Sequence, residues 1–547
     1  MVEDFVQLEF LHVEDCKMME QVIFTEGSTE EERRNQMFFS KLKRLELEHL
    51  PKLTTFCFET QIGQHIQASN LEVHNSALFN EKVVFPSLEE LTITGMRNCT
   101  QIWQDQLAVN SFCKLKKIRV EGCEQLLNIF PFNMVERLEE LAELLIKNCD
   151  SFEEIIRPQG IIANESHAVT APQSMAAETV TTKFAFPKLT CLVLDMLPRL
   201  RRFYSRMHAT EWPSLKRMEV IKCPKVQIFA PQCHRFRETP SGNQVAISNQ
   251  QALFYVNEDT FPVLEELTVS DGQLPSECFR EVKRLNLQYF PQPSTAFPSG
   301  FIDSLPNLEK LVINDASICQ IVQSEGFSNE GRHTPTAAQI KELRLSKLPE
   351  LTHLWKEELQ PGAALCNLGI LIVLECGKLK TLGPSLLSLK NLTTLEVSRC
   401  HGFINLMACS TAKSLTLLEK ISITDCERME EIIACENEEI KGGIVFPKVK
   451  YLQLSSLPTL ASFSLMHHAF EFPVLLRLIV TKFPKMKNFC QGDLSTPKLQ
   501  QMHLTRDGED ELRWEGDLNT TIKHMFDEMN VQNSDVTKVT HQLPRLE

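Results

Sequence analysis

The chain lacks the short motifs that mark most enzymes and metal-binding domains. Its 18 cysteines never form a Cys-x-x-Cys pair, the usual pattern of zinc ribbons and thioredoxin-like proteins. No Gly-x-x-x-x-Gly-Lys-Ser/Thr occurs, and the 20 glycines do not cluster into a phosphate-binding loop. The His467-His468 pair has no cysteine at a spacing that completes a tetrahedral site, so it predicts a solvated loop. We therefore expect no enzymatic activity, no cofactor and no metal site.

Long apolar runs and an excess of positive charge are also missing. No apolar stretch approaches the roughly 20 residues that span a bilayer, and the acidic residues 1–5 do not resemble a secretory signal. The net charge of -14 argues against binding to nucleic acid or to an anionic membrane, because both need a basic surface. These features predict a cytoplasmic protein without a membrane span.

What the chain has instead is one pattern, L-x-x-L-x-[LIV]-x-x-C-x-x-[LMF], repeated along nearly its whole length. One copy places Leu115, Ile118, Val120, Cys123 and Leu126 in this order. Strand residues two apart share a face, so each unit directs a short strand and then a turn residue toward one core. A single unit cannot bury its apolar face and must stack on neighbours. The pattern is that of leucine-rich repeats, and it predicts function on a long surface rather than in a catalytic pocket.

About seventeen units can be placed, of which the one starting at Val282 is the weakest match. Because a solenoid grows by repetition, we expect one continuous array over residues 1–506. The expected fold class is α/β: a leucine-rich-repeat solenoid, or horseshoe, with a parallel concave sheet and an irregular or short helical convex side. Polar insertions predict loops at about residues 26–36, 59–82, 157–183, 231–259, 323–337 and 435–443.

Residues 507–547 depart from the repeat pattern and are expected to form a capping segment and tail. Asp517 can cap a helix in which Leu518, Ile522, Met525 and Phe526 recur on one face. Such a helix would close the open end of the repeat core.

Cysteines recur at one equivalent position of the repeat, where leucine stands in other units, as at Leu50 and Leu197. The position therefore favours a small buried apolar group, and packing explains these cysteines better than disulfides do. We expect buried, reduced thiols and a reducing compartment. The equivalent cysteines are Cys16, Cys123, Cys149, Cys223, Cys376, Cys400 and Cys426.

A second pattern alternates with the first. Here Phe-Pro precedes the strand and Leu-Pro replaces the cysteine turn, as at Phe186-Pro187 and Leu197-Pro198. Proline fixes φ and removes a hydrogen-bond donor where the strand ladder has ended.

The outward side chains of the strands form the most informative surface, because successive side chains alternate between core and solvent. Charge and exposed apolar character make some of these positions better candidates for partner binding than others. The predicted concave-face residues are Lys117, Arg119, Arg217, Glu219, Arg344, Ile370, Ile372, Leu374, Tyr451 and Arg477.

One unit is ambiguous. If Cys376 sets the register, Ile370, Ile372 and Leu374 form an exposed apolar stripe of the kind that marks a partner site. A shift of one residue in the run 368–374 would bury them instead. Both alternatives remain open from the sequence.

Several phrases resemble one family. They are Phe-Pro-x-Leu-x-x-Leu at 85–91 and 261–267, Trp-Pro-Ser-Leu-Lys-Arg-Met-Glu-Val at 212–220, Met-Glu-Glu-Ile-Ile at 429–433 and Trp-Glu-Gly-Asp-Leu at 514–518. Together they resemble the leucine-rich region of plant nucleotide-binding leucine-rich-repeat disease resistance proteins of the coiled-coil class. The resemblance implies a defence module that contacts a pathogen effector or a guarded host protein and restrains a nucleotide-binding module. It assigns no individual binding residue.

Two other classes use similar repeats. A substrate receptor of a ubiquitin ligase also has cysteine-type repeats, but no F-box-like segment precedes these units. A secreted receptor ectodomain would need a signal peptide and Asn-x-Leu-x-Gly-x-Ile-Pro turns. Because the first unit has no amino-terminal cap, we expect the chain to be a fragment or truncated relative of a resistance protein that docks on a nucleotide-binding module.

Overall fold

The computed structural model describes most of the repeat array. The described residues are 7–25, 37–59, 77–158, 182–206, 208–231, 252–270, 278–294, 305–322, 340–355, 366–382, 389–435, 443–506 and 509–528. Most residues of the predicted polar insertions lie outside these ranges. One exception corrects the prediction for 231–259, because β18 (Ala252–Val256) is a buried strand within it. The structure divides into two compact units, Met1–Val282 and Lys283–Glu547.

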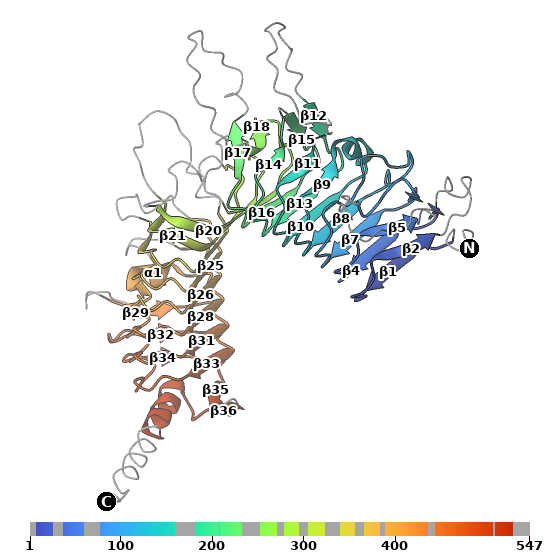
Figure 1. Ribbon diagram of the computed structural model, residues 1–547. Coiled ribbons are helices and arrows are strands. Elements are labelled where there is room, and N and C mark those ends of the chain that lie inside the picture. Colours follow the sequence, from blue (N-terminus) through green and yellow to red (C-terminus); the bar gives the residue numbers. More distant parts are fainter. Residues whose placement is uncertain are drawn as a thin grey trace, which may run out of the picture. The chain divides into compact units, whose positions relative to one another are not determined.

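In unit 1 the repeat strands form one parallel ladder in chain order (Figure 1). Each strand takes the five residues, or four in the last case, on which the repeat pattern alternates. From the second strand onward, alternate side chains of these residues are buried in the core. The strands are β1 (Phe10–Glu14), β4 (Arg44–Glu48), β7 (Glu90–Thr94), β8 (Lys117–Glu121), β10 (Glu143–Lys147), β13 (Cys191–Asp195), β16 (Arg217–Ile221) and β19 (Glu266–Val269).

Unit 2 repeats the same arrangement, and its ladder closes with an antiparallel pair, β35 and β36. The unit that starts at Val282, the weakest match to the repeat pattern, supplies β20 with Leu285 and Leu287 in the core. The strands are β20 (Arg284–Ser294), β21 (Lys310–Ile318), β23 (Glu342–Ser346), β25 (Ile370–Leu374), β26 (Thr394–Ser398), β28 (Lys420–Thr424), β31 (Tyr451–Ser455), β33 (Arg477–Thr481), β35 (Met502–Arg506) and β36 (Glu509–Arg513). The leucine-rich-repeat solenoid predicted from the sequence is therefore the observed fold.

A left-handed residue ends most repeat strands and explains why cysteine recurs one position later. Asn148 and Asp425 have φ of 54° and 53°, and Gly95 and Gly122 stand at equivalent positions. This sharp turn directs the next side chain into the core. The Sγ of Cys149 then donates to the carbonyl of Lys147 at 3.2 Å, so a small thiol fills the site and makes a weak hydrogen bond.

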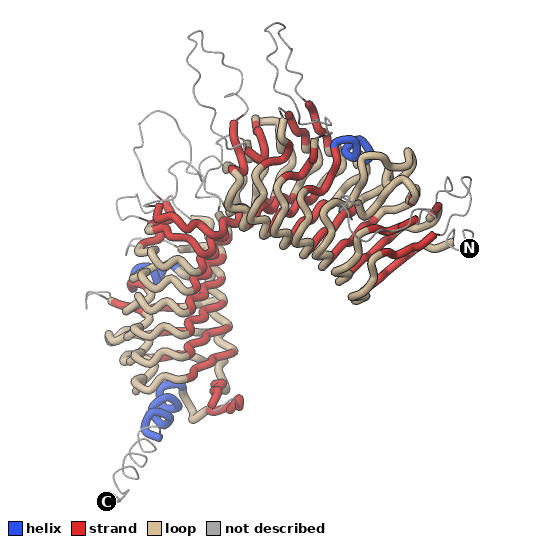
Figure 2. The backbone as a smooth tube through the Cα atoms, in the orientation of Figure 1, coloured by secondary structure: helices blue, strands red, loops and turns tan. Residues whose placement is uncertain are grey.

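The side opposite the repeat strands is more regular than expected. It contains α1 (Cys409–Ser414) and the 3-10 helix η2 (Phe132–Arg137), but most of its regular structure is short parallel pairs between neighbouring turns (Figure 2). The paired strands are β2 (Gln21–Thr25) with β5 (Thr55–Glu59); β3 (Met37–Phe38) with β6 (Val83–Val84); β9 (Asn128–Pro131) with β11 (Glu154–Arg157) and β14 (Arg202–Tyr204); β12 (Thr182–Ala185) with β15 (His208–Glu211); β17 (Gln227–Pro231) with β18; β22 (Gln320–Val322) with β24 (His353–Trp355); β27 (Met407–Ala408) with β29 (Ile433–Ala434); and β30 (Ile444–Val445) with β32 (Phe470–Glu471) and β34 (Leu494–Ser495).

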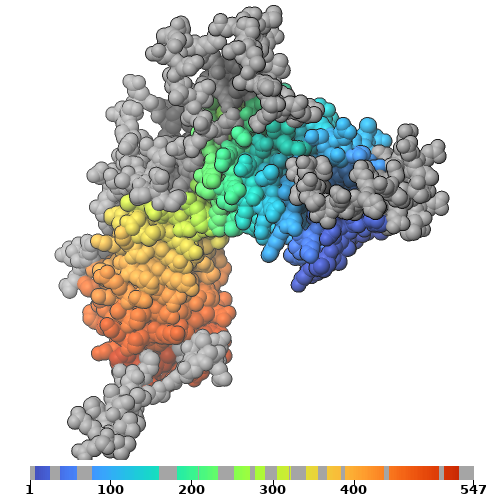
Figure 3. Space-filling view, viewed as in Figure 1, coloured from blue at the N-terminus to red at the C-terminus, as the bar shows by residue number. Residues whose placement is uncertain are grey.

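Within each unit the repeats stack in chain order (Figure 3). Buried aromatic rings connect successive repeats. Phe186 stacks on Trp212 with ring centroids 4.8 Å apart, and Phe446 stacks on Phe472 at 5.1 Å. These are the aromatic residues of the Phe-Pro and Trp-Pro phrases. The second sequence pattern therefore marks a core position, and its rings contribute about 0.5–1.5 kcal/mol per pair beyond their area of contact.

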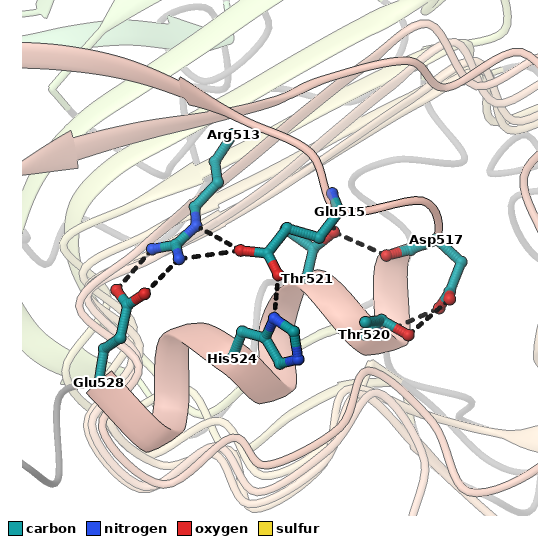
Figure 4. A network of polar contacts seen from close by, with 7 residues as sticks. All are labelled: Arg513, Glu515, Asp517, Thr520, Thr521, His524 and Glu528. Atoms are coloured by element: carbon teal, nitrogen blue, oxygen red, sulfur yellow. Dashed lines mark hydrogen bonds and ion pairs between the residues drawn. The ribbon is translucent and has the colours of Figure 1, made fainter.

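The predicted capping helix forms at residues 518–528. Asp517 accepts a hydrogen bond from the backbone N–H of Thr520 at 2.9 Å, as an N-cap does, and Leu518 and Ile522 are buried. Polar contacts hold the preceding segment against this helix (Figure 4). Arg513 donates to Glu528 and to Glu515.

Candidate interaction surface

The outward residues of the repeat strands define what we call the strand face of each unit. On β8, Ile118 and Val120 are buried, whereas Lys117, Arg119 and Glu121 lie on the opposite side of the strand. The alternation predicted from the repeat is thus observed. All ten candidate residues lie on the strand face, in the phase that the sequence predicted.

In unit 1, ion pairs tie the charged candidates to neighbours on the strand face. Lys117 Nζ lies 3.0 Å from Glu143 Oε2 on the next strand, and Arg119 Nη2 lies 2.9 Å from Glu121 Oε2. Arg217 donates to Glu219, 2.6 Å away, and this hydrogen bond raises the pKa of the Arg217 guanidinium. Exposed pairs of this kind contribute only about 0–1 kcal/mol to folding. Their main effect is to fix the positions of these charges on the strand face.

An apolar centre between these charges was missed by the sequence analysis. Parallel pairing places Arg119, Leu145, Val193 and Glu219 in one row on successive strands. Val193 is buried although it belongs to the strand face, and Leu145 is half-buried. The same alternation that selected the charged residues marks Leu145 and Val193 as outward.

In unit 2 the structure resolves the ambiguous register. Leu371 and Val373 are fully buried, so the alternative that would bury Ile370, Ile372 and Leu374 through a shifted register is wrong. Ile372 pairs with Arg344 on β23 and with Glu396 on β26, both strand-face residues.

The predicted exposed apolar stripe is only partly exposed. Ile372 is only 8% exposed, and Ile370 and Leu374 are half-buried. The long side chains of Arg344 and Glu396 lie beside Ile372, because neighbouring strands are only about 4.8 Å apart. Ile370, Ile372 and Leu374 thus form a small apolar patch, which we call the apolar floor. Charged strand-face residues of β23 and β26 lie on either side of it and form its walls.

The wall on the β23 side is an ion-pair network. Arg344 donates to Glu342, and Lys310 Nζ lies 3.0 Å from the Glu342 carboxylate. Burial raises the pKa of Glu342, but the hydrogen bonds from Arg344 and Lys310 outweigh burial and lower it overall. The network therefore keeps Glu342 charged and holds Arg344 beside Ile372.

Further along unit 2, Tyr451 and Arg477 are register partners on adjacent strands. Lys420 Nζ lies 5.5 Å from the centroid of the Tyr451 ring and 2.6 Å from Glu396 Oε1. The Tyr451 hydroxyl donates to Gln453 at 2.8 Å. The contacts of Lys420 thus link β26, β28 and β31 on the strand face.

The candidates thus gather into separate groups. Lys117 and Arg119 share β8, and Arg217 and Glu219 share β16, with β10 and β13 between the two strands. In unit 2, Arg344 adjoins the three residues of β25, whereas Tyr451 and Arg477 lie three and four strands beyond β25.

A different cluster lies on the opposite side of unit 2. Cys409 and Cys435 form a disulfide with a Cα–Cα distance of 5.2 Å, and His468 lies next to them. The predicted solvated loop holds for His467, which is exposed, but is wrong for His468, which is 9% exposed. No local sequence pattern marks this cluster, because its members lie one repeat apart. The possible ligand atoms of all three residues lie within 4.8 Å of one another.

One strand per repeat, alternate apolar residues in a continuous core and a buried cysteine or leucine at each turn define a leucine-rich-repeat protein. The sequence matches the family described as "Plant disease resistance protein RPS2-like, leucine-rich repeats" over residues 1–76, 87–235, 256–388 and 383–502. The chain belongs to this family. It is therefore related to plant defence proteins.

Curated relatives agree with this assignment. The chain is 30% identical to the disease resistance protein UNI of Arabidopsis thaliana over 141 residues, covering 25% of this chain and 15% of that protein. It is 32% identical to the disease resistance protein SUMM2 of the same species over 134 residues, covering 22% of this chain and 14% of that protein. The matched segment thus spans about one-seventh of each relative.

Among solved structures, the Drosophila Toll receptor in its complex with Spätzle has 13% identity and a TM-score of 0.34, covering 86% of this chain and 66% of that one. No helix in the described ranges is long and apolar enough to cross a membrane.

Proposed function

We propose that this chain is a plant immune recognition module that binds a protein partner on its strand faces. The observation that carries the proposal is the apolar floor of Ile370, Ile372 and Leu374 beside the oriented charges of Arg344 and Glu342. A desolvated apolar centre within a polar rim is the usual arrangement of a binding hot spot. Partner candidates are a pathogen effector and a guarded host protein.

We further propose that the chain restrains a nucleotide-binding signalling module. Support comes from membership in a disease resistance family and from short matches to relatives much longer than the matched segment. A leucine-rich array that contacts both an effector and the signalling module could exchange one for the other through differential affinity. The whole protein acts in the cytoplasm in this proposal.

The proposal is tested with the nucleotide-binding module of a member of this family. That module is expressed in leaf tissue with and without the present chain, and cell death and co-precipitation are measured. Restraint predicts a physical complex and weaker cell death than with the module alone. Unchanged cell death together with no complex would reject the restraint role for this module.

A further inference from the structure

The cluster of Cys409, Cys435 and His468 has the chemistry of a metal site. Thiolate and imidazole groups are the preferred ligands of Zn²⁺, whereas Ca²⁺ and Mg²⁺ prefer oxygen. We propose that, when Cys409 and Cys435 are thiols, these two residues and His468 bind one Zn²⁺ ion on the side of unit 2 opposite its strand face. This proposal does not depend on the proposed immune function.

Strand pairing brings the two cysteines together. β27 pairs in parallel with β29, and the last register partners are Ala408 and Ala434. Cys409 and Cys435 follow these two residues directly, so they lie side by side on successive repeats. Their placement is a property of the ladder, and it persists whether or not a covalent bond joins the sulfurs.

The third repeat supplies His468. Its backbone N–H donates to the carbonyl of Met466 at 2.9 Å, and the next residue, Ala469, accepts a hydrogen bond from Ile444 at 2.8 Å. Gly492 of the following repeat approaches so closely that a Cβ there would collide with the His468 carbonyl. The backbone on both sides of the imidazole is thus held in place.

The side chain of His468 lacks a hydrogen-bonding partner at one nitrogen. Its Nε2 is buried and makes no hydrogen bond within the described residues. A buried polar atom without a partner lowers the stability of the fold, so such atoms normally have one. A zinc ion held by the adjacent sulfurs would supply that partner.

Unit 1 contains an internal comparison. His208 occupies the position equivalent to His468, five residues after Phe203 as His468 follows Phe463. Its Nδ1 lies 2.8 Å from the Arg206 carbonyl oxygen, and its ring lies among aromatic rings. The ring centroids of Phe184, Phe203, Tyr204 and Tyr255 lie 6.1, 5.7, 5.9 and 5.8 Å away.

The residues around the two histidines differ, because two cysteines lie beside His468 where unit 1 has no sulfur ligand at the equivalent positions. β11 pairs with β9 through Arg157 and Pro131, so the residues equivalent to Cys435 and Cys409 are Pro158 and Phe132. Phe132 packs against Phe184 at 5.9 Å. Unit 1 therefore surrounds its histidine with apolar rings, whereas unit 2 replaces that environment with two sulfurs.

The disulfide and the metal site exclude each other. A dithiol reductant transfers two electrons and two protons to the Cys409–Cys435 bond, yields two thiols and becomes a disulfide itself. Zn²⁺ then displaces the two thiol protons and binds two thiolates and the neutral imidazole. Cys435 is half-buried, so solvent can provide the fourth ligand.

The test uses the full chain, reduced with dithiothreitol and then freed of it under argon. Co²⁺ is added as a spectroscopic substitute for zinc. We expect one equivalent of tetrahedral cobalt with thiolate-to-metal charge-transfer absorption, and displacement by Zn²⁺. The oxidised chain should bind none. Absence of the band in the reduced wild-type chain would overturn the proposal.

Variants locate the site. His468→Ala should weaken cobalt binding by more than about tenfold, because even second-shell changes weaken metal sites about 10- to 100-fold. The matched control His208→Ala removes the equivalent imidazole of unit 1 and should leave the cobalt spectrum unchanged. Equal binding by His468→Ala and the wild-type chain would reject the site.

A second measurement needs no variant. Zn²⁺ is added to the reduced wild-type chain, iodoacetamide follows, and mass spectrometry maps the alkylated cysteines. Zinc should slow alkylation of Cys409 and Cys435 by about tenfold or more, whereas the exposed Cys113 should react as before. Unchanged alkylation of Cys409 and Cys435 would show that the reduced pair does not bind zinc and would reject the site.

Discussion

The side-chain oxygen of Asn519 accepts a hydrogen bond from the backbone N–H of Phe489 at 2.9 Å, and so joins the C-terminal helix to the last repeat turn. The same oxygen accepts from the N–H of Cys490 at 3.2 Å. Asn519→Ala leaves both donors without this partner and should lower the free energy of unfolding by about 1–3 kcal/mol. Urea denaturation measures the change. Lys523→Ala, an exposed change on the same helix, should leave the midpoint within error, and equal effects of the two would contradict the assigned role.

Gly402 and Gly377 differ in the space that surrounds them. A Cβ at Gly402 would lie 2.5 Å from the carbonyl oxygen of Gly377, whereas a Cβ at Gly377 would meet nothing within 4 Å. Gly402→Ala should therefore destabilise unit 2 by about 1–3 kcal/mol, as overpacking does. Gly377→Ala is the matched control, and thermal melting compares them. A smaller loss of melting temperature for Gly402→Ala than for Gly377→Ala would contradict the close backbone approach.

Buried thiols should make stability depend on alkaline pH. Burial raises the pKa of Cys426 to about 12, whereas an unfolded cysteine titrates near 8.5. Between these values the unfolded chain loses the thiol proton and the folded chain keeps it. The contribution of Cys426 is thus fully present below about pH 8.5 and is lost as pH rises toward 12, by about 1.4 kcal/mol per pH unit.

Cys426→Leu isolates this effect, because leucine fills the equivalent position in other repeats. Urea midpoints are measured for both proteins at about pH 8 and pH 10. The wild-type chain should lose more stability than the variant across this interval. If stability depends on pH equally in both proteins, folding does not raise the pKa of the Cys426 thiol.

Partner binding should depend on Ile372 in the apolar floor and on Arg344 in the adjacent ion-pair network. Once a protein partner is available, Ile372→Ala and Arg344→Ala should each weaken binding by about tenfold or more, because each removes part of a desolvated centre or its oriented charge. Calorimetry gives the affinities, and circular dichroism checks the fold. Lys485→Ala, exposed on the turn after β33, is the control. Unchanged affinity in both strand-face variants would place recognition elsewhere.

The strands and turns could be predicted because their signals are local. Ile118, Val120 and Cys123 follow spacings within one repeat, and the backbone needs no distant information to place them in the core. The candidate residues Arg119, Arg217 and Arg344 were found in the same way. Leu145 and Val193 carried an equally local signal and were missed. The prediction of one continuous array over residues 1–506 remains a prediction, as does the expectation that the chain is a fragment.

The sequence by itself determined the period, the inward face and the helix cap at Asp517, because each depends on neighbours within one turn or one strand. Tertiary structure decided the rest. Ile372 is nearly buried because strand pairing places the side chains of Arg344 and Glu396 on either side of it. No pattern within its own repeat predicts that these neighbours shield it from solvent. Cys409, Cys435 and His468 meet only when three turns stack in parallel register. Groups one repeat apart become neighbours through the stacking itself, so their chemistry emerges only in the assembled solenoid.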